Sequence, residues 1–148
     1  MQKLNLPNYY IKLKKEDNKT FIFDSIRKKY LILTPEEWVR QNFIQFLIKD
    51  KNYPASLMAV EMGIDLLNTK KRCDIVCYNT KGLPHMIVEC KRPSIKISQK
   101  TFDQIARYNM NLNTELLIVT NGTEHYICKL NHTNKNYKFL KEIPTYSH

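Results

Sequence analysis

Apolar and polar residues alternate along the first part of the chain. Residues 9–13 (Tyr-Tyr-Ile-Lys-Leu), 21–23 (Phe-Ile-Phe) and 30–33 (Tyr-Leu-Ile-Leu) all contain short apolar runs or alternations of this kind. A period of two is typical of strands, because successive side chains of a strand point to opposite faces of the sheet. The pattern therefore predicts that the chain begins with β-structure.

A helix is predicted to follow directly. Thr34 is suited to the N-cap, Pro35 to the first helical position, and Glu37 completes a Thr-x-x-Glu capping box. We expect this helix to run to about Lys49, before the Asn-Tyr-Pro sequence at 52–54.

The apolar stripe of this helix indicates which acidic residue faces inward. The stripe consists of Val39, Phe43, Phe46 and Leu47. Extending it back by three residues from Val39 places Glu36 on the inward face and Glu37 toward the flank. Both glutamates remain candidates for a site, with Glu36 favoured because the capping box gives Glu37 a structural role.

The rest of the chain alternates between strand and helix patterns. A strand at 57–64 precedes a basic turn at 70–72, and two strands joined by a hairpin-length loop end near Tyr78 and Lys91. A second helix is predicted from Ser98 to about Asn111, and further strands at 115–120, 125–129 and 137–143. This helix is expected to bury Phe102, Ile105, Ala106 and Asn109 or Met110. The order β-α-β-β-β-α-β-β implies an α/β (α+β) fold with a mixed sheet and a helix packed on each side.

Length and composition fit one globular domain. The chain has 148 residues, of which 43% are hydrophobic and 26% charged. It has no apolar run long enough to span a membrane and no secretory signal, so we expect a cytoplasmic protein. The four cysteines do not follow a zinc pattern and are expected to be buried, reduced thiols. The net charge of +10 favours a polyanionic partner, nucleic acid before others, although a generally basic surface explains it too.

Asp74, Glu89 and Lys91 are the residues most suggestive of chemistry. Each lies on a short apolar strand, where a bare charge is costly unless it is paired or bound to a metal. If the two strands form a hairpin, both carboxylates can share a hard cation such as Mg²⁺, and such a cation activates water beside a phosphoryl oxygen. Lys91 can then orient that water or stabilise developing charge. The alternative is strand-end charges in water, or a cross-strand salt bridge.

Five stretches together resemble a known family. They are Thr34–Gln41, Lys71–Val76, Ile87–Pro93, Gln104–Asn109 and Val119–Gly122. In this order they resemble the PD-(D/E)xK nuclease superfamily, and within it the N-terminal nuclease domain of type I restriction enzyme R subunits. The resemblance covers about residues 27–129, which would form the core of a single restriction-endonuclease-like domain (1–148) with a β-rich extension at 1–26.

The resemblance implies Mg²⁺-dependent (possible also with Mn²⁺) hydrolysis of phosphodiester bonds in DNA, most simply double-stranded DNA. Asp74 and Glu89 would bind the metal, Lys91 would be the catalytic lysine, and Glu36 or Glu37 would complete the site. Residues expected near the DNA are Gln104, Tyr108, Arg72, Arg92 and Arg40. Without the resemblance, Gln104 and Tyr108 fit the solvated face of any amphipathic helix, and each arginine is one charge among 24.

The chain departs from this family in two respects. Cys73 stands where a proline is expected before the metal-binding aspartate, and there is no Walker A sequence. We therefore expect any ATP-driven motor or restriction partner to be a separate subunit, and a homodimer is possible because cutting both strands needs two sites. The alternative function is a non-catalytic nucleic-acid-binding or restriction-complex-associated module.

Overall fold

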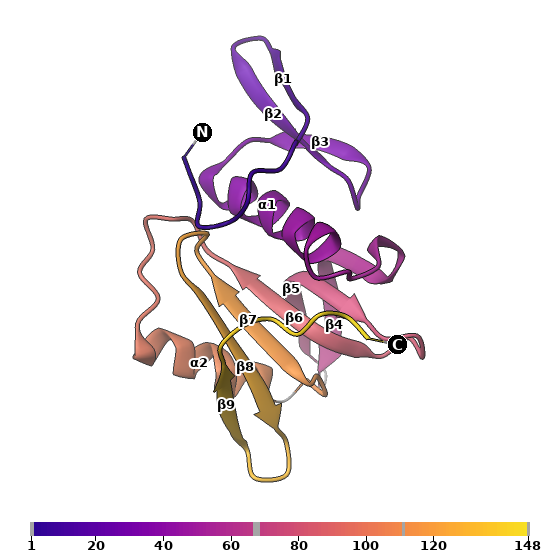
Figure 1. The fold of residues 1–148 in the computed structure, drawn as a ribbon, viewed down its shortest axis with the longest axis vertical. Helices are drawn as coiled ribbons and strands as arrows, with labels where there is room; N and C mark the ends of the chain where they lie inside the picture. Colours follow the sequence, from indigo (N-terminus) through magenta and orange to yellow (C-terminus); the bar gives the residue numbers. More distant parts are fainter. Residues whose placement is uncertain (1, 67–68, 111, 148) are drawn as a thin grey trace.

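The computed structural model describes residues 2–66, 69–110 and 112–147, with side chains left undescribed at 63–66 and 69–71. It is a mixed α+β fold with two sheets and two helices (Figure 1). The predicted fold class is thus confirmed. No helix in the described part of the chain is long and apolar enough to cross a membrane.

The smaller sheet is formed by the N-terminal strands and is antiparallel in the order β1-β2-β3. Its strands are β1 (Leu13–Glu16), β2 (Lys19–Asp24) and β3 (Lys29–Ile32). Asp17 and Asn18 have φ of 51° and 65°, as a two-residue hairpin turn requires. This turn pairs Glu16 with Lys19, and the pairing extends back to Leu13 opposite Ile22. The strand predicted at 9–13 is therefore wrong for all but its last residue.

The larger sheet has six strands in the order β4-β5-β6-β7-β8-β9. Its strands are β4 (Met58–Leu66), β5 (Thr69–Tyr78), β6 (Pro84–Cys90), β7 (Leu116–Thr120), β8 (His125–Asn131) and β9 (Asn136–Leu140). The β6–β7 pair is parallel and joined through α2 (Gln99–Asn109), and the other neighbours are antiparallel. The basic turn predicted at 70–72 is wrong, because these residues belong to β5 and pair with β4.

The two helices pack on opposite faces of this sheet, as predicted. One buried cluster joins α1 (Pro35–Lys49) to side chains such as Ile75, Val88 and Ile118. The other joins α2 to Val76, Ile87 and Leu117, the alternate residues of the same strands. All four cysteines are buried and form no disulfide, as expected from the sequence.

The predicted stripes and caps explain where the helices form. Val39, Phe43 and Leu47 of α1 are fully buried, and Phe46 is partly buried. In α2, Phe102, Ala106 and Asn109 are buried, while Ile105 and Met110 are partly buried. The side chains of Thr34 and Ser98 accept hydrogen bonds from the backbone N–H groups of Glu37 and Thr101, respectively. These caps help to fix the start of each helix.

Candidate active site

The β5–β6 pair opens at the end where the predicted site residues lie. Backbone pairing starts at Ile75 and Val88, and beyond it the Asp74 carboxylate accepts a hydrogen bond from the Cys90 backbone N–H at 2.8 Å. Cys73 packs in the α2 cluster although Ile75, two residues later, packs in the α1 cluster. Strand alternation is therefore interrupted at Asp74, which turns its carboxylate toward α1.

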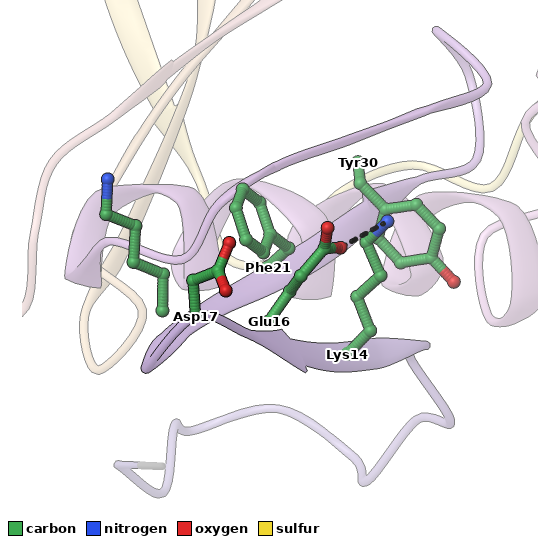
Figure 2. A pocket seen from close by; sticks show the side chains of 6 residues that line it. Lys14, Glu16, Asp17, Phe21 and Tyr30 are labelled. Atoms are coloured by element: carbon green, nitrogen blue, oxygen red, sulfur yellow. Dashed lines mark ion pairs between the residues drawn. The ribbon is translucent and has the colours of Figure 1, made fainter.

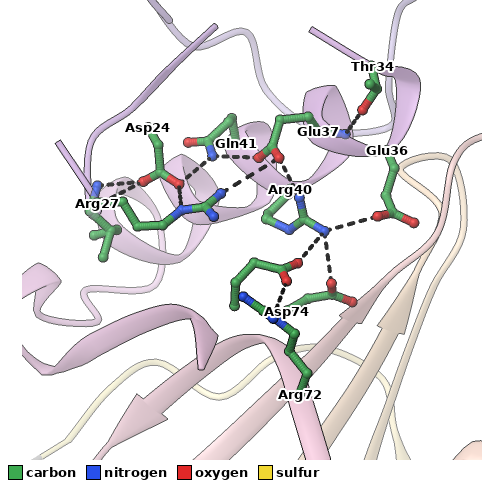
Figure 3. A network of polar contacts seen from close by, with 11 residues as sticks. Asp24, Arg27, Thr34, Glu36, Glu37, Arg40, Gln41, Arg72 and Asp74 are labelled. Atoms are coloured by element: carbon green, nitrogen blue, oxygen red, sulfur yellow. Dashed lines mark hydrogen bonds and ion pairs between the residues drawn. The ribbon is translucent and has the colours of Figure 1, made fainter. Parts of the chain in front are cut away.

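The guanidinium of Arg40 lies at the centre of four carboxylates (Figure 3). Its Nη2 atom is 2.8 Å from Asp74 Oδ1, 3.0 Å from Glu36 Oε2 and 3.0 Å from Glu61 Oε1. Its Nη1 atom donates to Glu37 Oε1 at 2.6 Å. We call Arg40, Glu36, Glu37, Glu61 and Asp74 the acidic cluster.

Negative charge outweighs positive charge in the acidic cluster. Burial disfavours the charged form of Arg40, but the hydrogen bond to Asp74 and the charges of Glu37 and Asp74 outweigh burial and raise its pKa. Nη2 has only two N–H groups, which it donates to Glu36 and Asp74, so Glu61 faces it as an ion pair without a hydrogen bond. Nε of Arg40 is buried and has no hydrogen-bond partner in the described structure.

Arg40 is expected from the sequence to lie near the DNA, where it would contact a phosphate, but in the structure its side chain is buried. It is 4% exposed, and carboxylates take up both of its terminal nitrogens. A guanidinium enclosed in this way holds the protein's own acids together and does not face the solvent.

The predicted orientation of the two helix glutamates is reversed. The Glu37 side chain is 10% exposed, whereas that of Glu36 is 48% exposed. The buried face of α1 includes Arg40 and Gln41 as well as the apolar stripe, so it turns further toward Glu37 than the apolar residues alone indicate. The cap at Thr34 is present, but the Glu37 carboxylate accepts hydrogen bonds from Arg40 and Gln41.

Glu61 belongs to the cluster but was missed in the sequence. The β4–β5 register pairs Val60 with Ile75 and Met62 with Cys73, which places Glu61 opposite Asp74. Its φ of 56° lies in the left-handed region, which is uncommon for a residue other than glycine, asparagine or aspartate. An acid inside the apolar run 57–64 was the available signal, the same signal that drew attention to Asp74.

A chain of polar contacts connects the cluster to the N-terminal sheet (Figure 3). The Gln41 side-chain amide donates to Glu37 Oε2 at 2.8 Å and to Asp24 Oδ2 at 3.0 Å. Asp24 is fully buried and also accepts from the backbone N–H groups of Ile26 and Arg27 and from Arg27 Nε. Burial raises the pKa of Asp24, but the hydrogen bonds from Arg27 and Gln41 outweigh burial and lower it.

Glu89 and Lys91 lie next to the cluster, at the end of β6. Val88 and Cys90 pack in the α1 cluster and Ile87 in the α2 cluster, so alternation directs Glu89 toward the α2 side of the sheet. Burial raises the pKa of the Cys90 thiol, and the negative charges of Asp74, Glu89 and Glu36 raise it further. The Cys90 residue thus lies between Asp74, which accepts from its backbone N–H, and its chain neighbour Glu89.

The other predicted DNA contacts are all exposed. Arg72 has 74% of its side chain exposed and forms an ion pair with Glu61 at 2.8 Å, and Arg92, two residues after the end of β6, is also exposed. Gln104 and Tyr108 lie four residues apart on α2, and Tyr108 is 50% exposed. Each of these side chains is therefore accessible to a ligand on the surface.

The donor set suits a hard divalent cation. Oxygens of Glu36, Glu61 and Asp74 converge within 3.0 Å of a single nitrogen, and carboxylate oxygens are the ligands that Mg²⁺ prefers. Among the described residues no group of three or more acidic, histidine or cysteine side chains is arranged to hold a metal ion, and the Arg40 guanidinium lies between the carboxylates. The residues thus fit such an ion in chemistry, with Arg40 as their present counter-charge.

Comparison with known families identifies the chain's relatives. A sequence model of the type I restriction enzyme R protein N terminus matches residues 35–144, about three quarters of the chain. A search of curated proteins finds no match. The chain therefore belongs to the family of type I restriction enzyme R protein N-terminal domains, as its sequence motifs indicated.

Proposed function

We propose that this member of the type I restriction enzyme R protein N-terminal family is a metal-dependent DNA endonuclease domain. The observation that carries the proposal is the acidic cluster at the opening between β5 and β6, with Glu89 and Lys91 beside it. Buried carboxylates are costly for a fold, and a cluster of them beside a lysine on a basic protein suits hydrolysis of a phosphodiester.

In this proposal Asp74 and one helix glutamate hold Mg²⁺, or Mn²⁺ in its place, and Glu89 supplies a further carboxylate. Strand alternation directs Glu89 toward the α2 side, so its side chain would have to turn around the end of β6 to reach the ion. Glu36 is the better candidate for the helix glutamate, because its side chain is half exposed and contacts Arg40, which lies among the carboxylates. Glu37 bonds to Arg40 and Gln41, so we assign it the task of fixing Arg40. When bound, the metal would supply an activated water and neutralise charge on the phosphoryl oxygen.

The role assigned to Lys91 is to stabilise charge that develops on the phosphate. Its backbone N–H donates to the Thr120 carbonyl at 2.8 Å, which fixes the start of its side chain at the end of the sheet. Arg72 and Arg92, both exposed, are assigned to phosphates of the DNA, and Gln104 and Tyr108 to its positioning on the α2 side. The partners we propose are double-stranded DNA and separate restriction subunits, within the cytoplasm.

A plasmid assay tests the proposal directly. Supercoiled plasmid is incubated with the protein in Mg²⁺ or Mn²⁺, with EDTA as the blank, and nicked and linear products are measured. We expect metal-dependent nicking that Lys91→Ala abolishes and that Lys138→Ala, an exposed lysine on β9, leaves unchanged. Nicking that survives in Lys91→Ala would reject Lys91 as a catalytic residue and point to a contaminating nuclease.

A non-catalytic DNA-binding module is the second candidate. The observation that favours it is the position of Arg40, which already compensates the carboxylates without a metal. Under this alternative the protein retards DNA in a gel but leaves it intact in either metal, and Asp74→Asn does not alter the retardation.

A further inference from the structure

The N-terminal segment, residues 1–34, carries a concentration of positive charge and lies outside the family match. Residues 1–34 precede the matched region and contain eight Lys and Arg residues against three Asp and Glu residues. Less than a quarter of the chain thus supplies a net charge of +5, half of the total of +10. A polyanion is the partner that this segment suits.

Three aromatic rings share one face of this sheet with lysines. The register places Lys14 beside Phe21, Phe21 beside Ile32 and Phe23 beside Tyr30, all on the same side. Figure 2 shows Lys14, Glu16, Phe21 and Tyr30 around a surface hollow on that side. We call Lys12, Lys14, Lys19, Phe21, Phe23 and Tyr30 the lysine–aromatic face.

The lysines lie over the rings. Lys14 Nζ is 4.4 Å from the centre of the Tyr30 ring and 5.8 Å from that of Phe21, and Lys12 Nζ is 5.4 Å from that of Phe23. Tyr30 is 36% exposed and its neighbour Ile32 is 54% exposed, so solvent reaches apolar surface between the charges. Two acids also line the hollow: Glu16 is paired with Lys14 at 3.5 Å, and Asp17 lies in the hairpin turn.

We propose that the lysine–aromatic face binds a single-stranded polynucleotide. Aromatic rings stack on the flat faces of unpaired bases, and lysines beside them neutralise the phosphates. A duplex keeps its bases stacked on each other and offers only its backbone, so it would use the lysines and leave the rings without a partner. The combination of rings and lysines on one exposed face therefore favours the single strand.

This binding is independent of the acidic cluster. Arg40, Asp74 and Glu61 lie between α1 and the six-stranded sheet, whereas the rings lie on the three-stranded sheet, which is separate in Figure 1. The proposal can therefore be tested in EDTA, where no metal-dependent cleavage takes place, and its outcome does not depend on the proposed nuclease activity.

The test measures the affinity of the full chain for labelled nucleic acids by fluorescence anisotropy. The probes are 20-nucleotide oligo-dT and oligo-U and a duplex of equal length. We expect tighter binding of one or both single strands than of the duplex. Tyr30→Ala should weaken single-strand binding by about 5- to 150-fold, the effect of losing one stacked base, whereas Tyr30→Phe should bind like the wild type. Lys14→Ala with Lys19→Ala should reduce the slope of log affinity against log salt by about 1.4.

A matched lysine pair controls for the loss of charge. Lys138→Ala with Lys141→Ala removes the same charge from exposed positions in and directly after β9, an edge strand of the six-stranded sheet. If this pair weakens binding as much as the Lys14 and Lys19 pair, or if the duplex binds as tightly as the single strands, the proposal is overturned. The lysine variants and Tyr30→Phe keep the test decisive even if Tyr30→Ala does not fold.

Discussion

The acidic cluster and the lysine–aromatic face use charge in opposite ways. In the acidic cluster, Arg40 is buried and each of its terminal nitrogens is held by carboxylates at 2.6–3.0 Å. On the lysine–aromatic face, the lysines are exposed and lie 4.4–5.8 Å from ring centres. In the acidic cluster each charged group is held in place by its partners, whereas the lysines of the lysine–aromatic face are accessible to a ligand.

Burial is the reason for this difference. A buried charge without a partner costs several kcal/mol, so the acidic cluster exists only because its charges compensate one another. An exposed lysine is compensated by water and needs no partner in the protein. Substitutions in the acidic cluster are therefore expected to change stability, and substitutions on the lysine–aromatic face are expected to change binding.

The largest effect is expected from Arg40→Met. It removes the guanidinium that faces Asp74 and leaves Glu37 with the more distant Arg27, at 3.7 Å, as its counter-charge, so it should lower the free energy of unfolding by about 3–5 kcal/mol, measured with urea in metal-free buffer. Arg72→Met removes an arginine that bonds to the same cluster from outside, with 74% of its side chain exposed. This control should cost at most about 1 kcal/mol.

A divalent cation should restore part of the stability that Arg40→Met loses. With the guanidinium gone, Mn²⁺ can take its place among the carboxylates, so it should raise the melting temperature of Arg40→Met more than that of the wild type. Equal shifts in the two proteins would show that the ion does not bind where Arg40 lies.

A smaller but still large effect is expected from Asp24→Asn. Asp24 is fully buried and accepts four hydrogen bonds, so loss of its charge should cost about 2–3 kcal/mol at pH 7. Because its pKa in the folded protein is lowered below 3.8, this stability is present above pH 3.8 and is lost as the pH falls through the lowered value. The difference between wild type and variant in urea unfolding should therefore shrink below pH 3.8.

The exposed Glu142→Gln is the control for this measurement. Glu142→Gln should have the same free energy of unfolding as the wild type at pH 7 and below pH 3.8. A difference between Asp24→Asn and wild type that stays constant down to pH 2 would mean that the charge of Asp24 is not what stabilises the fold.

The sequence predicted the elements more fully than the site. Local signals such as the Thr34 cap and the stripe of Val39, Phe43 and Leu47 lie within a single helix, and the structure confirms them. The order of strands and helices was enough to predict a mixed sheet between two helices. The start of β1 was missed because a positive-φ turn at Asp17 and Asn18 fixes the register from outside the strand.

The centre of the acidic cluster could not be predicted from local patterns. An arginine on a helix is usually exposed, and Arg40 is buried only because Glu61 and Asp74 come to it from β4 and β5. The helical stripe was drawn from apolar residues, so it did not include Gln41, which is 1% exposed. Contacts between distant segments decide these positions, and the sequence does not display them.

A difference of about 1 kcal/mol in the free energy of unfolding is expected between two variants of Glu61, which separate the effect of its charge from that of its backbone conformation. Glu61→Gln removes the charge but keeps a Cβ at φ 56°, whereas Glu61→Gly removes both the charge and the strain. Glu61→Gly should therefore be more stable than Glu61→Gln by about 1 kcal/mol, the cost of a side chain in the left-handed region. At an ordinary strand position the glycine variant would be less stable than the glutamine variant. If urea unfolding shows Glu61→Gly to be less stable than Glu61→Gln, the backbone of Glu61 is not strained.

The smallest effect is expected from Lys14→Gln on the lysine–aromatic face. This lysine has an exposed ion pair with Glu16 at 3.5 Å and a contact to the Tyr30 ring, so its loss should change the free energy of unfolding by at most about 1 kcal/mol. The difference should shrink further between 0.1 M and 0.5 M NaCl, because salt screens exposed charges, whereas the cost of Arg40→Met should persist. A loss above about 2 kcal/mol would mean that Lys14 supports the sheet itself, and weaker DNA binding by its variants would then reflect folding.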